Sequence, residues 1–236
     1  MKPVSTNRSI VVWQDDVLYP AVMYRESACR AGADLIQRLF RMDLYDALLA
    51  LYRPGAEASS VRKALRETRV AGDDRLVRKV SECMVAHTPC IAPYEDALET
   101  FGMLQAMGIP MGLIGEGPTI GQRLVAERLG AERLFQHIGF FDPRTGAHAW
   151  QDALMLMELC GGIAVEGAVM ICADPARTQA LAAQGWRVYH VDRRREAPDG
   201  IGAASNIVPT ANLYDLPEAL GLVAWEDASR ADVRIA

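Results

Sequence analysis

Apolar and polar positions follow two alternating patterns along the chain. Short apolar runs typical of buried strands are separated by stretches with apolar residues at i, i+3 and i+4, the spacing of an amphipathic helix. The pattern predicts strands at 9–13, 109–114, 138–141, 168–172 and 186–191, with a weak edge strand at 206–208. It predicts helices at 96–107, 120–129, 152–159 and 177–184, and another from about Leu216. Strands that alternate with helices indicate a parallel sheet covered on both faces.

Residues 20–90 follow a different rule, because the helical spacing continues there without any strand of comparable strength. Pro54-Gly55 and Gly72 interrupt this block, which predicts several helices rather than one. The sequence therefore predicts an α/β core formed by 1–19 and 91–225, a helical insertion at 20–90 and a tail at 226–236.

Composition narrows the class of protein. The chain has 236 residues, of which 50% are hydrophobic and 23% charged, so it can bury a core and is not a disordered chain. Its net charge of −5 argues against nucleic acid and anionic membranes as partners. Five scattered cysteines, a polar N-terminus and the lack of a long apolar run predict a soluble cytoplasmic protein.

Carboxylates follow several of the predicted strands. Asp15 and Asp16 come after the first, Glu116 follows the second, and Asp174 follows the fourth. Ligands of open parallel sheets bind at this carboxyl edge, and carboxylate oxygens suit a hard cation such as Mg²⁺. The alternative is that each Asp caps the next helix or closes a turn. The residue pattern leaves both interpretations open.

Four longer segments carry a family resemblance. They are MGLIGEG (111–117), QRLVAERLGAERLFQHIGFF (122–141), VMICADP (169–175) and AAQGWRVYHVD (182–192). In this order, after a helical insertion, they resemble the haloacid dehalogenase (HAD) superfamily with a helical cap of the C1 type. The resemblance covers about residues 10–220 and implies a three-layer Rossmannoid core. It also implies hydrolytic chemistry through an aspartyl-phosphate, with Mg²⁺ as the cofactor.

The family's first signature is a strand ending in Asp-x-Asp, in which the first Asp is the nucleophile. Counting from the apolar strand places Gln14 at the nucleophile position and Asp16 at the acid–base position. A shift by one residue makes Asp15 the nucleophile but places Val17 at the acid–base position. Aligning the following residues instead leaves Trp13 where the nucleophile belongs. No register recovers the signature.

The other signatures are also altered. Gly115 stands where the resemblance implies a Ser or Thr that holds the phosphoryl group, and Glu116 and Gly117 follow it. No Lys occurs between the third strand and Asp152, so Arg144 is the candidate for neutralising the transferred group. Asp174 remains as one metal-binding acid, with Asp16 as the other candidate ligand.

These departures lead to one main hypothesis and two alternatives. The main hypothesis is a HAD-like protein that has lost phosphoryl transfer and serves in binding, regulation or scaffolding. The first alternative is a Mg²⁺-dependent, phosphatase-like hydrolase of a small phosphorylated metabolite that uses Asp15 or Asp16. The second is a nucleotide-binding module, suggested by the glycines at 115, 117 and 121.

The partner under these hypotheses is a small phosphorylated ligand or an unidentified protein, and a homodimer is compatible with them. The run Arg193-Arg194-Arg195 after the fifth strand is expected to lie in a solvated loop.

Overall fold

The computed structural model describes residues 9–70, 72–146, 149–193 and 204–222. Its centre is a parallel sheet of six strands in the order β3-β2-β1-β4-β5-β6. The strands are β1 (Ile10–Trp13), β2 (Met111–Glu116), β3 (His137–Phe141), β4 (Val169–Cys172), β5 (Arg187–Val191) and β6 (Ile207–Thr210). β1 lies between β2 and β4, with Ile10 paired to Met111 and to Val169. The weak edge strand of the sequence is β6.

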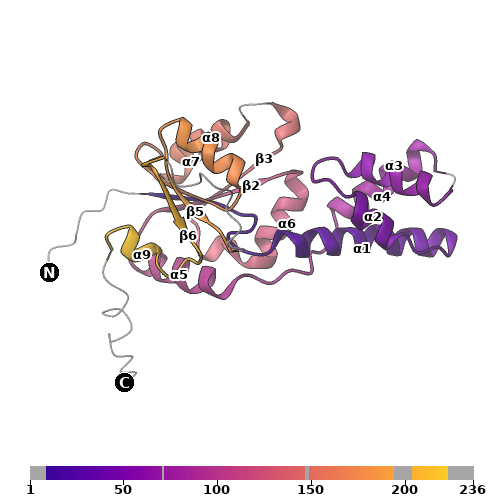
Figure 1. Cartoon of the computed structure of the whole chain (residues 1–236), viewed down its shortest axis with the longest axis horizontal. Helices are drawn as coiled ribbons and strands as arrows, with labels where there is room; N and C mark the ends of the chain where they lie inside the picture. Colours follow the sequence, from indigo (N-terminus) through magenta and orange to yellow (C-terminus); the bar gives the residue numbers. More distant parts are fainter. Residues whose placement is uncertain (1–8, 71, 147–148, 194–203, 223–236) are drawn as a thin grey trace, which may run out of the picture.

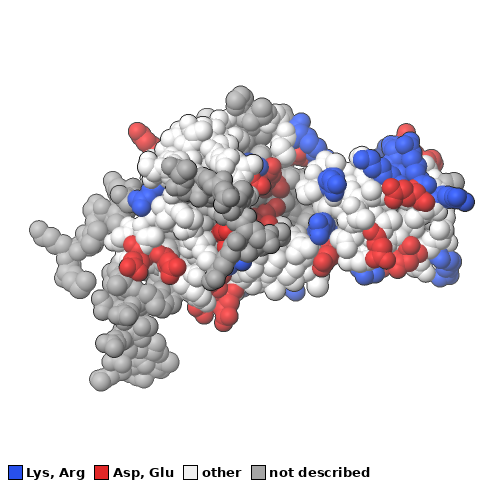
Figure 2. All heavy atoms as spheres, viewed as in Figure 1, with Lys and Arg blue, Asp and Glu red and all other residues white. Residues whose placement is uncertain are grey.

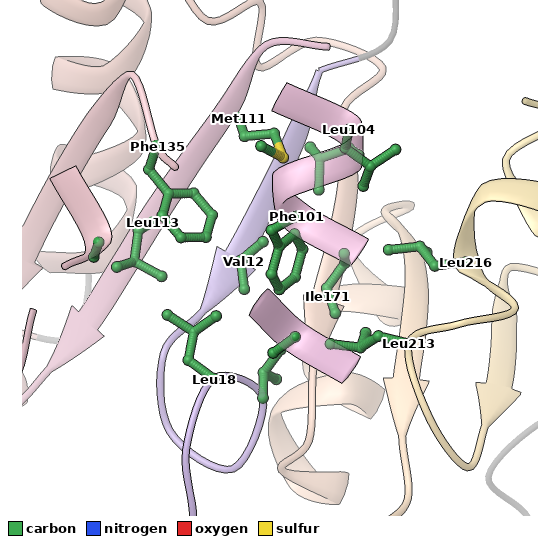
Figure 3. Packing of buried hydrophobic residues seen from close by; sticks show 14 of the residues in the cluster. Val12, Leu18, Phe101, Leu104, Met111, Leu113, Phe135, Ile171, Leu213 and Leu216 are labelled. Carbon is green, nitrogen blue, oxygen red and sulfur yellow. The ribbon is translucent and has the colours of Figure 1, made fainter. Parts of the chain in front are cut away.

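Helices cover both faces of this sheet (Figure 1). One face carries α5 (Glu95–Ala106), α6 (Thr119–Leu129) and the short α9 (Leu216–Ala219); the other carries α7 (Ala149–Gly161) and α8 (Pro175–Ala183). Alternate residues of each strand serve the two faces, which is why the strand sequences are apolar throughout. Val12 packs under Phe101 of α5 (Figure 3), whereas its neighbour Val11 belongs to the cluster under α7 and α8. The predicted three-layer α/β core is confirmed.

The insertion after β1 consists of α1 (Ala21–Phe40), α2 (Tyr45–Leu51), α3 (Glu57–Glu67) and α4 (Asp74–Val85). These helices form a cap that extends from one end of the core (Figure 1) and has a hydrophobic cluster of its own, including Ile36, Leu48 and Met84. Gly32 lets α1 and α4 approach closely, because a Cβ there would lie 2.8 Å from Cγ of Met84. Pro54-Gly55 separates α2 from α3, as the sequence predicts.

One boundary differs in a way that matters for the site. The sequence predicts that the second strand ends at Ile114. In the structure β2 continues through Glu116, because Gly115 and Glu116 pair with Phe140 and Phe141 of β3. The turn begins at Gly117, whose φ of 136° suits glycine. Glu116 is therefore the last residue of β2 and lies at the carboxyl edge of the sheet.

The predicted tail at 226–236 lies outside the described residues. Within the described part of the chain, no helix is both long and apolar enough to cross a membrane.

Candidate active site

A cavity of about 510 Å³ lies at the carboxyl edge of the sheet, below the loop that joins α2 to α3. Acidic atoms gather in this recess between core and cap (Figure 2). Five carboxylates line the cavity: Asp15, Asp16, Glu116, Asp174 and Asp192. The cap contributes Pro54 and Gly55, and the cationic lining residues are Arg177 and Arg193. The structure thus brings together the strand-end acids that the sequence singled out, and adds two arginines.

The end of β1 presents alternate residues to this cavity. Trp13 and Asp15 line it, whereas Gln14 does not. The Gln14 side chain is fully buried, and its Nε2 donates a hydrogen bond to Oε1 of Gln122 on α6 at 2.8 Å. Gln14 therefore lies away from any ligand in the cavity. Trp13, Asp15 and Asp16 are the residues of this segment that line the cavity.

Asp15 is the carboxylate whose protonation is most changed by the fold. Burial raises its pKa to about 6, and the charges of Asp16 and Glu116 act in the same direction. The Tyr19 hydroxyl donates a hydrogen bond to Oδ1 at 2.8 Å and opposes this shift, as does the positive charge of Arg177. A carboxyl group that titrates near neutral pH is suited to accept or donate a proton.

The Asp16 side chain accepts a hydrogen bond from the nearby backbone. Its Oδ1 accepts a hydrogen bond from the backbone N–H of Ala21, the first residue of α1, at 2.9 Å. Its φ of 57° places it in the left-handed region, which Asp tolerates better than most residues. The interpretation as a capping or turn residue therefore accounts for Asp16.

Asp174 is also used in capping. Its Oδ1 accepts a hydrogen bond from the backbone N–H of Arg177 at 2.7 Å and so caps α8. Among the described residues, no three His, Cys, Asp or Glu side chains lie close enough together to hold a metal ion. Asp16 and Asp174 instead each give one carboxylate oxygen to a backbone N–H at the start of a helix.

The guanidinium group of Arg177 lies among the carboxylates that line the cavity. Arg177 forms an ion pair with Glu116, and its Cζ lies 4.5 Å from the centre of the Trp13 ring. The indole Nε1 of Trp13 donates to the same carboxylate at 3.3 Å. The negative charge of Glu116 is therefore balanced within the protein by Arg177. Sequence reasoning missed this contact, because Arg177 and Glu116 are 61 residues apart and lie at the carboxyl ends of different strands.

Arg193 is not solvated, so that expectation is wrong for this residue. Its Nη1 donates to Asp96 at 2.9 Å, its Nε donates to the backbone oxygen of Asp16 at 3.1 Å, and its Cζ lies 3.7 Å from the centre of the Tyr94 ring. A guanidinium can bridge several acceptors in this way because of its fixed fork of donors. Arg194 and Arg195 lie outside the described residues.

Of the predicted phosphate-pocket positions Gly115, Glu116 and Gly117, only the last two line the cavity. Glu116 and Gly117 line the cavity, whereas Gly115 faces α6, where a Cβ would lie 2.9 Å from Cδ1 of Phe140 and 3.1 Å from Oε1 of Gln122. The space for a Ser or Thr side chain is therefore already filled.

Arg144 is not among the residues that line the cavity. Its Nε donates to both oxygens of Asp142, at 2.8 and 2.9 Å, and its Nη1 donates to the backbone oxygen of Gly55 in the cap at 3.3 Å. Its observed role is a link between core and cap.

The glycines of the suggested nucleotide loop have a packing role in this structure. A Cβ at Gly121 would lie 2.6 Å from the hydroxyl of Tyr24 on α1, and a Cβ at Gly117 would lie 3.1 Å from Nε2 of Gln122. Close packing between core and cap therefore explains Gly121 without a nucleotide.

Comparison with known proteins places this geometry in context. No family model matches the sequence, and no curated protein matches it. Solved structures do match. A putative HAD-hydrolase YfnB from Bacillus subtilis, bound to magnesium, shares 12% identity with a TM-score of 0.65, covering 91% of this chain and 99% of that one.

Two further structures are similar over the same share of the chain. A predicted phosphoglycolate phosphatase from Haemophilus somnus 129PT has a TM-score of 0.65 at 11% identity, with 91% and 99% of the two chains covered. A 2-haloacid dehalogenase from Pseudomonas syringae pv. tomato DC3000 has a TM-score of 0.60 at 16% identity, with 91% and 98% covered. Identities this low establish the fold alone. The chain therefore has the haloacid dehalogenase-like fold, as its sequence resemblance predicts.

Proposed function

We propose that this chain is a HAD-type hydrolase of a small anionic substrate, with Asp15 as its acid–base residue and without a resident metal ion. The observation that carries the proposal is the position of Asp15, which lines the cavity and has a pKa raised by burial to about 6. The similar structures described as a hydrolase, a phosphatase and a dehalogenase support the reaction class.

The proposed chemistry is a single displacement by water. Above pH 6 the ionised Asp15 accepts a proton from a water molecule, which attacks the phosphorus of a phosphomonoester or the halogen-bearing carbon of a 2-haloacid. The bond to the alcohol or halide then breaks, and the leaving group takes the bonding electrons. An alcohol leaves with the proton from Asp15, whereas a halide leaves as the anion and Asp15 releases its proton to water. Arg177 is the cation whose charge acts on Asp15, and it is placed to stabilise negative charge that develops nearby.

Metal independence distinguishes this proposal from the Mg²⁺-dependent alternative of the sequence. It rests on the donor set, because Asp16 and Asp174 accept backbone N–H groups and a guanidinium pairs with Glu116. A divalent cation at this edge would have to compete with Arg177 for the same carboxylate.

The test is hydrolysis of a panel of phosphomonoesters and 2-haloacids, measured with Mg²⁺ and with EDTA. We expect turnover that EDTA does not change, that rises with pH through about 6, and that Asp15→Asn abolishes. Asp16→Asn should keep turnover, since an amide oxygen still accepts from the Ala21 N–H, but loss of the Asp16 charge should lower the pKa of Asp15 and shift the pH dependence of turnover downward. Turnover that requires Mg²⁺, or that survives in Asp15→Asn, would overturn the proposal.

A second candidate function is binding without turnover, which the sequence suggested first. The observation in its favour is that neither Trp13 nor Gln14 can form the covalent aspartyl intermediate of the family. In that case the wild-type chain binds members of the same panel saturably, as seen by calorimetry, and releases no product. Binding should then be weakened by Arg177→Gln, because Arg177 lines the cavity.

A further inference from the structure

A second cavity lies at the base of the cap, on the side of α1 that faces the segment following α4. It has a volume of about 560 Å³ and shares no lining residue with the cavity at the sheet edge. Ser27 of α1 and His87 both line it. Both side chains are half-buried. This groove therefore exposes a hydroxyl and an imidazole from two separate segments of the chain.

The two groups form a short hydrogen bond. Oγ of Ser27 lies 2.7 Å from Nε2 of His87, and Nδ1 of His87 lies 2.7 Å from the backbone oxygen of Met84. A carbonyl oxygen can only accept, so Nδ1 carries the proton and the neutral ring presents a lone pair at Nε2. The Ser27 hydroxyl must then donate to His87.

The surroundings keep the imidazole in this state. Burial lowers the pKa of His87, so the ring is neutral at pH 7 and can take up a proton. The ring of Tyr24 lies 5.2 Å from the ring of His87, centre to centre, and restricts it from one side. A serine that donates to an imidazole, which is itself oriented by a third group, is the arrangement that activates a hydroxyl as a nucleophile.

An alternative acceptor for the hydroxyl lies close by. The backbone oxygen of Tyr24 lies 3.1 Å from Oγ of Ser27. When His87 is protonated, Nε2 can donate to Oγ and the hydroxyl can turn to Tyr24 without losing a hydrogen bond. The Ser27 hydroxyl is therefore hydrogen-bonded in both protonation states of His87.

We propose that Ser27 and His87 form a second reactive site, in which Ser27 is a nucleophile toward esters with a small apolar acyl group. Oγ forms a bond to the carbonyl carbon while His87 Nε2 takes the hydroxyl proton. The bond to the alcohol oxygen then breaks, and the alcohol leaves with the proton from His87. Water, deprotonated by His87, hydrolyses the acyl-serine and restores both groups.

The groove suits such a substrate. Met23, Ala31 and Tyr45 provide apolar lining for the acyl group. Arg30 lines the same groove, and its Cζ lies 3.6 Å from the centre of the Tyr45 ring, so the groove that contains Ser27 also holds a positive charge that can stabilise an oxyanion.

The experiment uses the full chain and a fluorophosphonate probe, whose phosphorus bonds to an activated serine as fluoride leaves. We expect one adduct by intact mass, located in the tryptic peptide 26–30, and none in Ser27→Ala. His87→Asn should form the adduct at least about 100-fold more slowly, since it removes the base. Its amide N–H can still donate to Met84, so the local fold is retained, which circular dichroism and the melting temperature would check.

Ser81→Ala is the control for nonspecific labelling. Ser81 lies on α4 of the same cap, and its hydroxyl donates to the backbone oxygen of Val77 at 2.6 Å. Labelling in this variant should match the wild type. The proposal is overturned if the folded wild type gives no adduct at Ser27, or if His87→Asn is labelled at the wild-type rate.

Discussion

At the scale of single residues, the raised pKa of Asp15 suits proton transfer but lowers the free energy of unfolding at neutral pH. Its pKa rises from 3.8 to about 6 on folding, so the native state binds more protons than the unfolded state between these values. The free energy of unfolding should therefore fall by roughly 2 to 3 kcal/mol as the pH rises from 4 to 6. Asp15→Asn removes this fall and should be the more stable chain at pH 7.5. Urea unfolding of both chains at pH 4.5 and 7.5 measures the difference.

Only the difference between the two chains is informative here, because other groups titrate in the same range. Burial lowers the pKa of His190, for example, and Arg144 lowers that of Asp142, but both contributions are common to wild type and variant. A wild type and an Asp15→Asn variant with parallel pH profiles would mean that the fold does not raise the pKa of Asp15.

Gly115 shows why the lost phosphate-binding hydroxyl cannot simply be restored. A Cβ at this position meets Phe140 at 2.9 Å and Gln122 at 3.1 Å, so Gly115→Ala should destabilise the protein by about 1 to 3 kcal/mol. Gly102→Ala is the matched control. It lies inside α5 with no atom within 4 Å of the added Cβ, so it should stabilise by up to about 1 kcal/mol. Thermal unfolding that shifts both variants in the same direction would contradict this packing.

At the scale of elements, Arg193 holds together segments that are distant in the chain. It follows β5, pairs with Asp96 at the start of α5, and donates to the backbone oxygens of Asp16 and Val17 after β1. Asp96 also accepts from the backbone N–H of Leu213 at 2.9 Å and is only 6% exposed. Removing either charge leaves the other buried without its partner.

Arg193→Ala should therefore destabilise the protein by roughly 3 to 5 kcal/mol in denaturant unfolding. Arg128→Ala, at an exposed position of α6, should change the stability by less than about 0.5 kcal/mol. A double variant with Asp96→Ala should be less destabilised than the sum of the single changes, since the lone buried charge is gone. Strict additivity would show that the ion pair does not couple β5 to α5.

The difference between local spacing and contacts distant in the chain explains what the sequence could and could not predict. Strands and helices were predicted correctly because their spacing is local: the apolar run before Gln14 becomes β1, and the amphipathic stretch after Tyr94 becomes α5. The order of the strands is not local, and neither are the contacts of Arg177 and Arg193. Those contacts depend on which strand ends become neighbours, so sequence reasoning names four carboxylates that line the cavity, Asp15, Asp16, Glu116 and Asp174, but misses Asp192 and the contacts of the two arginines.

At the scale of the whole molecule, the chain contains separate hydrophobic cores. The cap cluster is formed by α1 to α4 and the residues Leu44 and Tyr52 that flank α2, whereas two other clusters lie on the faces of the sheet. Core and cap meet through smaller contacts, such as the hydrogen bond from Arg144 to Gly55 and the packing of Tyr24 against Gly121. Because the main cavity lies between them, movement of the cap would change access to Asp15.

Separate cores predict separate local stabilities, which paired cavity-forming variants can test. Leu48 is 1% exposed in the cap, and Leu113 is fully buried in the sheet. Each change to Ala should cost about 2 to 5 kcal/mol, but in the part that contains it. By hydrogen exchange, Leu48→Ala should speed exchange of amides in α1 to α4 while those of β1 and β4 keep their wild-type rates. Leu113→Ala should speed exchange in the sheet. If Leu48→Ala accelerates the strands as much as the cap, the two parts unfold as one unit, and opening of the cap alone could not admit a substrate.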